Sequence, residues 1–172
     1  MGYKIDRECS MRVLPDKLVR RVGEEVSKTD PVRANREIRK IGLNQPDLLG
    51  FVMEATENLS MEGGDLAIYL FYLVWEVFHR GGARFKRIPK SSIKFRFGRN
   101  QHLLEKLEMR DHLRNRLNIF PVLSQPYLIK YIGGLIMQGE EDSRAISEDE
   151  KGFVFVLIKS LIEALDHAAR KA

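Results

Sequence analysis

Apolar positions recur at helical spacing along most of the chain. Leu48, Val52 and Ala55 follow one another at intervals of four and three residues, which places them on one face of a helix. The stretch 66–78 is apolar on nearly every side, a pattern typical of a helix buried beneath other helices. The apolar residues of 153–165 are expected to be buried in the last helix. The pattern predicts an all-α fold, a helical bundle of about six or seven helices.

Residues that satisfy the backbone groups at helix ends mark the expected boundaries. Asp30 followed by Pro31 predicts a helix start, and Gly42 predicts the end of the same helix in the left-handed conformation. Ser147 with Glu150 has the spacing of a capping box, which predicts the start of the last helix. Further helix starts are expected near Pro15, Pro46, Ser60 and Pro126.

One sequence pattern occurs twice. LNQPDLLGFV at 43–52 returns as LSQPYLIKYI at 123–132, eighty positions later. We expect two similar three-helix units, HEAT-like or a duplicated bundle, that bury each other's apolar surfaces in one domain spanning residues 1–172. The alternative is coincidental reuse of common start signals. The expected parts are a first repeat at 30–80, a basic, partly extended connector at 81–100 and a second repeat at 101–172.

Composition places the chain among ordinary globular proteins. Apolar residues make up 44% and charged residues 31%, and a single cysteine, Cys9, excludes an internal disulfide framework. The longest uncharged apolar run, 66–75, is about half the length needed to cross a bilayer. We therefore expect a cytoplasmic protein without membrane contact. The oligomeric state stays open, with a homodimer as one alternative.

Charge is segregated along the middle of the chain. Residues 45–79 carry six acids and no Lys or Arg, whereas residues 80–101 carry eight bases and no acid. Phenylalanines alternate with the bases, and the stretch IKFRFGR also fits a short strand or hairpin arm. Cations that neutralise phosphates and aromatic faces that stack on bases are typical of nucleic-acid binding. The candidate contact residues are Arg80, Arg84, Phe85, Lys86, Arg87, Lys90, Lys94, Phe95, Arg96, Phe97 and Arg99.

Two other interpretations of this basic segment remain open. As a linker it can lie in solvent or dock on the acidic half of the same molecule, with its phenylalanines anchored in the core. It can also form a site for a small anionic ligand. Charge runs are most often solvated or internally paired, so docking is the simpler hypothesis.

The pattern most similar to a metal site is incomplete. Glu76 and His79 form E-x-x-H, the pattern of carboxylate-bridged di-iron bundles, but no second E-x-x-H follows. His79 near the negative end of a helix explains the pair more simply. A second possible row of metal ligands lies on a helix expected over 101–117. Its members are His102, Glu105, Glu108 and His112. Because the same helix also carries several bases, a salt-bridged surface is favoured. We expect neither a metal nor another cofactor.

No catalytic constellation is complete. Cys9 has no histidine nearby in sequence, and none of the nucleophile-elbow, P-loop or dinucleotide-binding patterns occurs. Aromatic residues at helical spacing are more often core than pocket; here they are Tyr69, Phe71, Tyr72, Trp75 and Phe78. The sequence therefore predicts a non-catalytic binding or adaptor domain that recognises a protein partner. Nucleic-acid binding through 80–101 is the second hypothesis, and a metal-dependent enzyme is the third.

Overall fold

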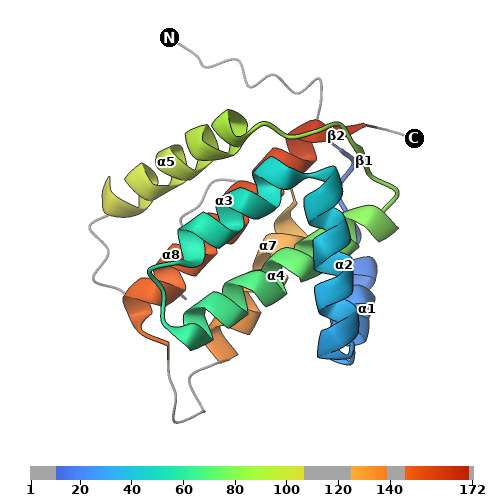
Figure 1. The fold of residues 1–172 in the computed structure, drawn as a ribbon, viewed down its shortest axis with the longest axis horizontal. Coiled ribbons are helices and arrows are strands. Elements are labelled where there is room, and N and C mark those ends of the chain that lie inside the picture. Colours follow the sequence, from blue (N-terminus) through green and yellow to red (C-terminus); the bar gives the residue numbers. More distant parts are fainter. Residues whose placement is uncertain (1–10, 107–124, 139–145, 171–172) are drawn as a thin grey trace.

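A computed structural model describes residues 11–106, 125–138 and 146–170, which form an all-α fold (Figure 1). The helices of these residues are α1 (Asp16–Ser27), α2 (Pro31–Asn44), α3 (Pro46–Thr56), α4 (Met61–Arg80), α5 (Lys90–Lys106), α7 (Pro126–Gln138) and α8 (Glu148–Ala168). Two short strands, β1 (Arg84–Phe85) and β2 (Ala169–Arg170), follow α4 and α8 and pair with each other in antiparallel orientation. The predicted all-α class is confirmed.

The two longest helices, α4 and α8, pack against each other at the centre of the molecule (Figure 1). Phe71 and Phe78 of α4 and Phe155 of α8 are almost completely buried. The other helices surround this pair: α5 and α7 pack on α8, while α1 and α3 pack on α4. The expectation that the apolar stretches form core helices is therefore confirmed. Within the described residues, no helix is both long and apolar enough to cross a membrane.

The predicted helix starts at three caps are confirmed. Asp30 accepts a hydrogen bond from the Val32 N–H at 3.4 Å, with Pro31 in the first turn of α2. Ser60 Oγ accepts from the Gly63 N–H at 3.1 Å. Ser147 Oγ accepts from the Glu150 N–H at 3.2 Å, as the capping box predicts.

Glu150 also joins the starts of the two central helices. Its carboxylate accepts hydrogen bonds from the Ser60 N–H at 2.5 Å and from Ser60 Oγ at 3.1 Å, across ninety positions of sequence. These bonds, the backbone one first, lower the pKa of Glu150 below its ordinary value. One side chain thus supports the N-termini of both α4 and α8, where a negative charge is favourable.

Gly42 does not end its helix, so that prediction is wrong. The helix α2 continues to Asn44, and among the described glycines only Gly82 has a positive φ, 85°. Gly42 instead faces α3, where an added Cβ would lie 2.5 Å from Leu49 Cδ2. The glycine allows α2 and α3 to approach closely, and Gly82 supplies the left-handed residue after α4.

The basic connector is extended only at its beginning. Arg84 and Phe85 form β1, but α5 begins at Lys90, eleven residues before the helix expected from Gln101. The strand predicted from IKFRFGR is wrong, because Ile93 and Phe97 are four residues apart and both turn inward as helical neighbours. In the linear sequence, the alternation of apolar and basic residues obscures this helical spacing.

The two Gln-Pro pairs make similar contacts with distant backbone. Gln45 Nε2 donates to the Lys86 carbonyl at 3.0 Å, and its Oε1 accepts from the Ile88 N–H at 2.9 Å. Gln125 Oε1 accepts from the Leu14 N–H at 2.8 Å, and its Nε2 donates to the Arg12 carbonyl at 3.5 Å. Gln125 Nε2 also donates to Asp166 Oδ1 at 2.7 Å. Each buried glutamine therefore holds an extended segment that leads into a helix, α5 for Gln45 and α1 for Gln125.

Candidate functional site

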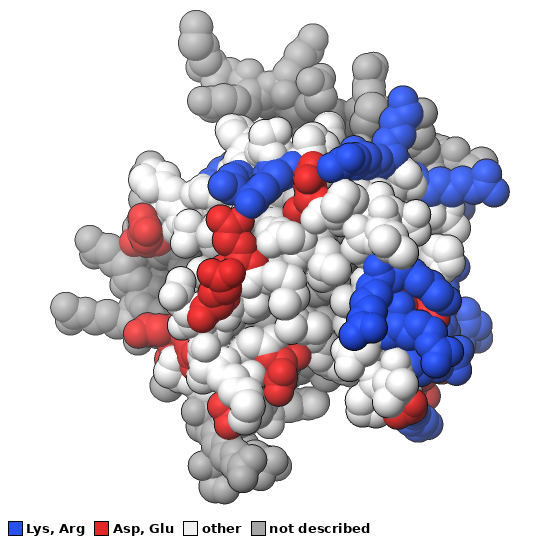
Figure 2. Space-filling view, viewed as in Figure 1, with Lys and Arg blue, Asp and Glu red and all other residues white. Residues whose placement is uncertain are grey.

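Several bases of the segment 80–101 are ion-paired within the molecule. Arg87 Nη2 lies 3.3 Å from Asp47 Oδ1, and Lys90 pairs with Glu54, so two bases meet the acidic side of α3. Figure 2 shows basic and acidic side chains adjoining along the upper edge of this face. The hydrogen bond and charge of Lys90 lower the pKa of Glu54. These contacts agree with the docked-linker hypothesis.

Two phenylalanines of the same segment anchor it to the core. The ring of Phe85 lies 5.2 Å from that of Trp75, centroid to centroid. Phe97 of α5 lies between Phe51 of α3, at 5.5 Å, and Phe153 of α8, at 5.6 Å, with edge-to-face geometry at both contacts. Such pairs add to the stabilisation from buried area. These aromatic faces are therefore occupied by protein neighbours.

The other members of the predicted contact set differ in exposure and in pairing. Arg84, Lys86 and Lys94 are exposed and have no ion-pair partner in the described part of the chain, and Phe95 is 70% exposed. Arg96 turns back on its own helix to Ser92, and burial lowers its pKa. Lys94 and Phe95 are thus the members that present a cation and an aromatic ring together.

A buried polar network, which the sequence analysis missed, fastens α5 to α8. Lys159 Nζ donates to Asn100 Oδ1 at 2.7 Å and to Glu163 Oε1 at 2.5 Å. Asn100 Nδ2 donates to Ser160 Oγ at 2.9 Å, and Arg99 Nη2 donates to Glu163 Oε2 at 3.0 Å. Burial lowers the pKa of Lys159, although Glu163 opposes this effect. The charge of Arg99 is therefore paired within the molecule, where it helps to hold α5 against α8. In the sequence, the sign of this network is Asn100, a polar residue seven positions after Ile93 and therefore on the same inward face of α5.

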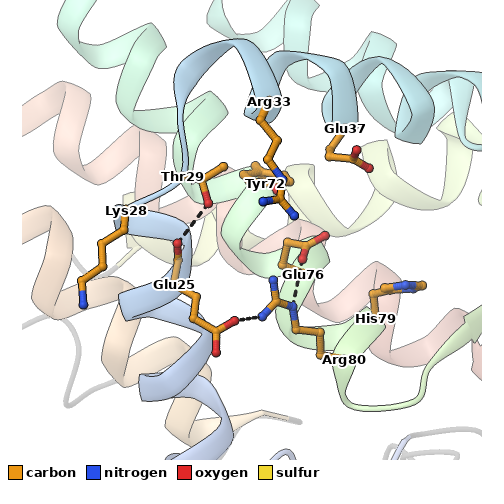
Figure 3. A pocket seen from close by; sticks show the side chains of 9 residues that line it. All are labelled: Glu25, Lys28, Thr29, Arg33, Glu37, Tyr72, Glu76, His79 and Arg80. Atoms are coloured by element: carbon orange, nitrogen blue, oxygen red, sulfur yellow. Dashed lines mark hydrogen bonds and ion pairs between the residues drawn. The ribbon is translucent and has the colours of Figure 1, made fainter.

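A polar pocket of about 540 Å³ opens between α1, α2 and α4 (Figure 3). The last turn of α4 lines one side of it with Glu76, His79 and Arg80. Arg80 Nε donates to Glu76 Oε2 at 3.0 Å, and Arg80 also pairs with Glu25 of α1. The residues that line the pocket are Glu25, Lys28, Thr29, Arg33, Glu37, Tyr72, Glu76, His79 and Arg80.

Charge compensation governs the chemistry of this pocket. Burial disfavours the charged form of Arg80, but its hydrogen bonds to Glu25 and Glu76 outweigh burial and raise its pKa above the ordinary value. Across the described residues, no group of three or more His, Cys, Asp or Glu side chains is arranged to hold a metal ion. Glu76 of the E-x-x-H pattern therefore has a positively charged partner within its own helix.

An apolar groove of about 590 Å³ lies where the end of α2 meets α3. Leu43 is 84% exposed and Met53 is 49% exposed, unusually high fractions for large apolar side chains. The residues that line the groove are Arg39, Gly42, Leu43, Pro46, Leu49, Gly50 and Met53. Gly42, where the two helices approach closely, is one of the residues that line this groove.

Exposed bases border the groove on α2. Arg36 and Arg39 follow Val32 and precede Leu43 at spacings of four, three and four residues, so all four share one helical face. Figure 2 shows Lys and Arg side chains gathered over α2, with an uncharged surface between them and the acids of α3 and α4. This patch is hard to recognise in the linear sequence, because Glu37 interrupts the bases there.

Other candidates of the sequence analysis contribute little to these surfaces. His102 Nδ1 lies 3.9 Å from Glu105 Oε2 on the surface of α5, and both side chains are exposed. Glu108, His112 and Cys9 lie outside the described residues. Of the aromatic residues, Phe71 and Phe78 are buried in the core; Tyr69 and Trp75 are partly buried against it; Tyr72 is buried and also lines the polar pocket.

Comparisons with models of protein families, with curated proteins and with solved structures found no match to this chain. The groove and the polar pocket are therefore interpreted from their own chemistry. They have α2 in common, but the groove is apolar with a basic border, whereas the pocket is lined by charges of both signs.

Proposed function

We propose that this chain is a cytoplasmic, non-catalytic binding domain that docks an acidic amphipathic helix of a protein partner on α2 and α3. The observation that carries the proposal is the exposure of Leu43, 84%, beside Met53 in an apolar groove. Burying a leucine side chain contributes about 1.5–3 kcal/mol, so leaving one in water at a groove has a substantial cost. Grooves of this kind are typical sites for the apolar face of a partner helix.

The charge around the groove favours an acidic partner. Arg39 lines the groove, and Arg36 lies one turn away on the same face of α2. Neither arginine has an ion-pair partner among the residues of 11–106, 125–138 and 146–170. Glutamates flanking the apolar anchors of a partner would meet these bases at the rim, where complementary charge increases the association rate and the specificity.

The groove lining also supports binding rather than catalysis. Apart from Arg39, its side chains are apolar or absent, so none of them is a candidate nucleophile or general base. Apolar anchors in a groove with a charged rim provide affinity and orientation, which are the requirements of an adaptor surface.

The same proposal includes a duplicated architecture. In support, Gln45 and Gln125 hold backbone two residues apart in the same way, ahead of Pro89 and Pro15 respectively. The packing of α1 on α7 and of α3 on α5 is reciprocal, and β1 pairs with β2. Within the predicted bounds, 30–80 and 101–172, α3 and α4 correspond to α7 and α8; these contacts favour adding α1 and α5 to that correspondence. Coordinates in which α1, α3 and α4 do not overlay on α5, α7 and α8 would contradict duplication.

The docking proposal is tested with two synthetic helical peptides. Both carry the same leucines at spacings of three and four residues, but one is flanked by Glu and the other by Lys. We expect the Glu-flanked peptide to bind at least about tenfold more tightly in fluorescence anisotropy, because Arg36 and Arg39 attract Glu and repel Lys, and a tenfold difference needs only about 1.4 kcal/mol in total. Equal binding of the two peptides, or no binding of either, would overturn the proposal.

Groove variants locate the binding surface. Leu43→Ala should weaken binding of the Glu-flanked peptide about tenfold, since truncation of a central apolar anchor commonly costs more than 1 kcal/mol. Val32→Ala is the matched control, because Val32 is 66% exposed on the same helix but does not line the groove. Equal losses in both variants contradict docking in the groove. If light scattering shows that the chain associates with itself through Leu43, the groove binds a second copy of the chain instead of a partner protein.

Nucleic-acid binding through α5 is the second candidate. The specific observation in its favour is Phe95, 70% exposed beside the exposed Lys94. Electrophoretic mobility shifts at two salt concentrations test it, because several phosphate contacts produce a steep dependence on salt. The candidate requires that Phe95→Ala and Lys94→Gln weaken the shift; no shift at low salt removes it.

A further inference from the structure

The polar pocket has a feature that is independent of the groove. Tyr72 is only 5% exposed, and its hydroxyl has no hydrogen-bond partner within the described part of the chain. Most buried polar side-chain groups are hydrogen-bonded, and an exception in a pocket calls for a partner from outside the chain. Burial, assisted by Glu76 and Glu37, raises the pKa of Tyr72, so the hydroxyl keeps its proton and can donate.

Two cations at the pocket also lack partners. Arg33 reaches into the pocket from α2, and Lys28 lies at its rim after the end of α1 (Figure 3). Neither makes an ion pair with any described residue, in contrast to Arg80, which holds both Glu25 and Glu76. Together with the Tyr72 hydroxyl, these groups supply hydrogen-bond donors suited to a carboxylate.

Acceptors lie in the same pocket. The side chain of Glu76 is 14% exposed, and its Oε2 accepts from Arg80 while Oε1 has no bond within the described residues. Glu37 likewise accepts from Lys40 through Oε1, at 2.8 Å, and not through Oε2. The three carboxylates of the lining, Glu25, Glu37 and Glu76, balance its three Lys and Arg side chains. A pocket with zero net charge and both signs on its walls favours a ligand of the same kind.

We propose that this pocket binds a small zwitterion, an α-amino acid, with its carboxylate on Arg33 and the Tyr72 hydroxyl and its ammonium group on Glu76. A volume of about 540 Å³ is within the range of small-molecule sites and leaves space for a side chain. The carboxylate satisfies the unpartnered hydroxyl, and the ammonium group meets the acceptors at Glu76 and Glu37. The pocket and the groove use different residues of α2, so the amino-acid site does not depend on the docking proposal.

The experiment uses the full chain and the common L-α-amino acids, each measured by isothermal titration calorimetry with thermal-shift screening first. At least one amino acid should bind with a dissociation constant below about 1 mM. Its decarboxylated amine and its deaminated acid should each bind at least about tenfold more weakly, because each lacks one charge-assisted contact. No binding by any member, or equal binding by a deaminated acid, would overturn the proposal.

Variants connect binding to the proposed atoms. Tyr72→Phe keeps the buried ring and removes only the hydroxyl, so affinity should fall about fivefold to tenfold while the fold is retained. Arg33→Gln should reduce affinity at least about tenfold, and Arg21→Gln, at an exposed arginine of α1 outside the pocket, should leave it unchanged. Circular dichroism confirms folding of each variant. Unchanged affinity in both Tyr72→Phe and Arg33→Gln contradicts the assignment, even if an amino acid binds elsewhere.

Discussion

Two basic helices of this protein use their charges in different ways. On α5 and the segment before it, Arg87, Lys90 and Arg99 are paired with acids of α3 and α8. On α2, Arg36 and Arg39 are exposed beside a groove and have no such partners among the described residues. Half of the eight bases of the segment 80–101 are therefore ion-paired within the described part of the molecule, whereas the two arginines beside the groove on α2 are not.

The apolar residues of the two helices differ in the same way. On α5, Ile93 is buried and Phe97 packs between two other phenylalanine rings. On α2 the only fully buried apolar residue is Ile41, while Leu43 remains exposed. A basic helix is a candidate surface when its apolar side chains, as well as its charges, lack partners. The following predictions are ordered by their expected effect on the free energy of unfolding.

The largest effect is expected on α5. Phe97→Ala removes a ring packed between Phe51 and Phe153 and should lower the free energy of unfolding by about 3 kcal/mol, measured by urea denaturation. Phe95→Ala on the same helix, where the ring is 70% exposed, should change it by less than about 0.5 kcal/mol. Similar losses in the two variants would show that the contrast between internal and exposed faces of α5 is wrong.

The junction between the two basic regions should be next in size. Gln45→Met keeps the length of the side chain but removes its bonds to Lys86 and Ile88, and leaves the buried Ile88 N–H without that acceptor. We expect a loss of about 2 kcal/mol in the free energy of unfolding. The same substitution at exposed Gln138 is the control and should have little effect. A loss below about 0.5 kcal/mol at Gln45 would contradict its role in holding α5.

A smaller and pH-dependent effect is expected where Glu150 joins α4 and α8. Because the folded-state pKa of Glu150 is lowered, its contribution is complete above the unfolded-state pKa, about 4.3, and is lost as pH falls through the folded-state value. Glu150→Gln should therefore lower the free energy of unfolding at pH 7 by less than about 1 kcal/mol, since the site is open to solvent. The difference from the native chain should disappear in acid. A difference that grows as pH falls would contradict this linkage.

The smallest effect on stability is expected on α2. Reversing Arg36 and Arg39 to Glu should change the free energy of unfolding by less than about 0.5 kcal/mol, because both side chains are exposed without ion partners in the described chain. The double variant should nevertheless bind the Lys-flanked peptide more tightly than the Glu-flanked one. Reversal of Lys86 and Lys94 is the matched control near α5. If that control reverses peptide preference and the α2 variant does not, the comparison of the two helices fails.

Much of the fold could be predicted from local chemistry. Pro31 after Asp30, the Ser60 and Ser147 caps and the apolar stretches of α4 and α8 each act within a few residues, so the linear pattern contains their signal. The start of α5 was missed because an alternating apolar and basic pattern also fits a strand. Only contact with Phe51 and Phe153 selects the helical face that contains Phe97.

By itself, the amino-acid sequence determined that the chain is helical, where most helices begin, and which two helices are apolar enough for the centre. The tertiary structure decided which charges are satisfied and which remain at the surface, since ion pairs such as Arg87 with Asp47 join residues forty positions apart. It also created the groove at Leu43 and the pocket at Tyr72. The physical reason is that helix formation depends on neighbours in sequence, whereas exposure and charge compensation depend on neighbours in space.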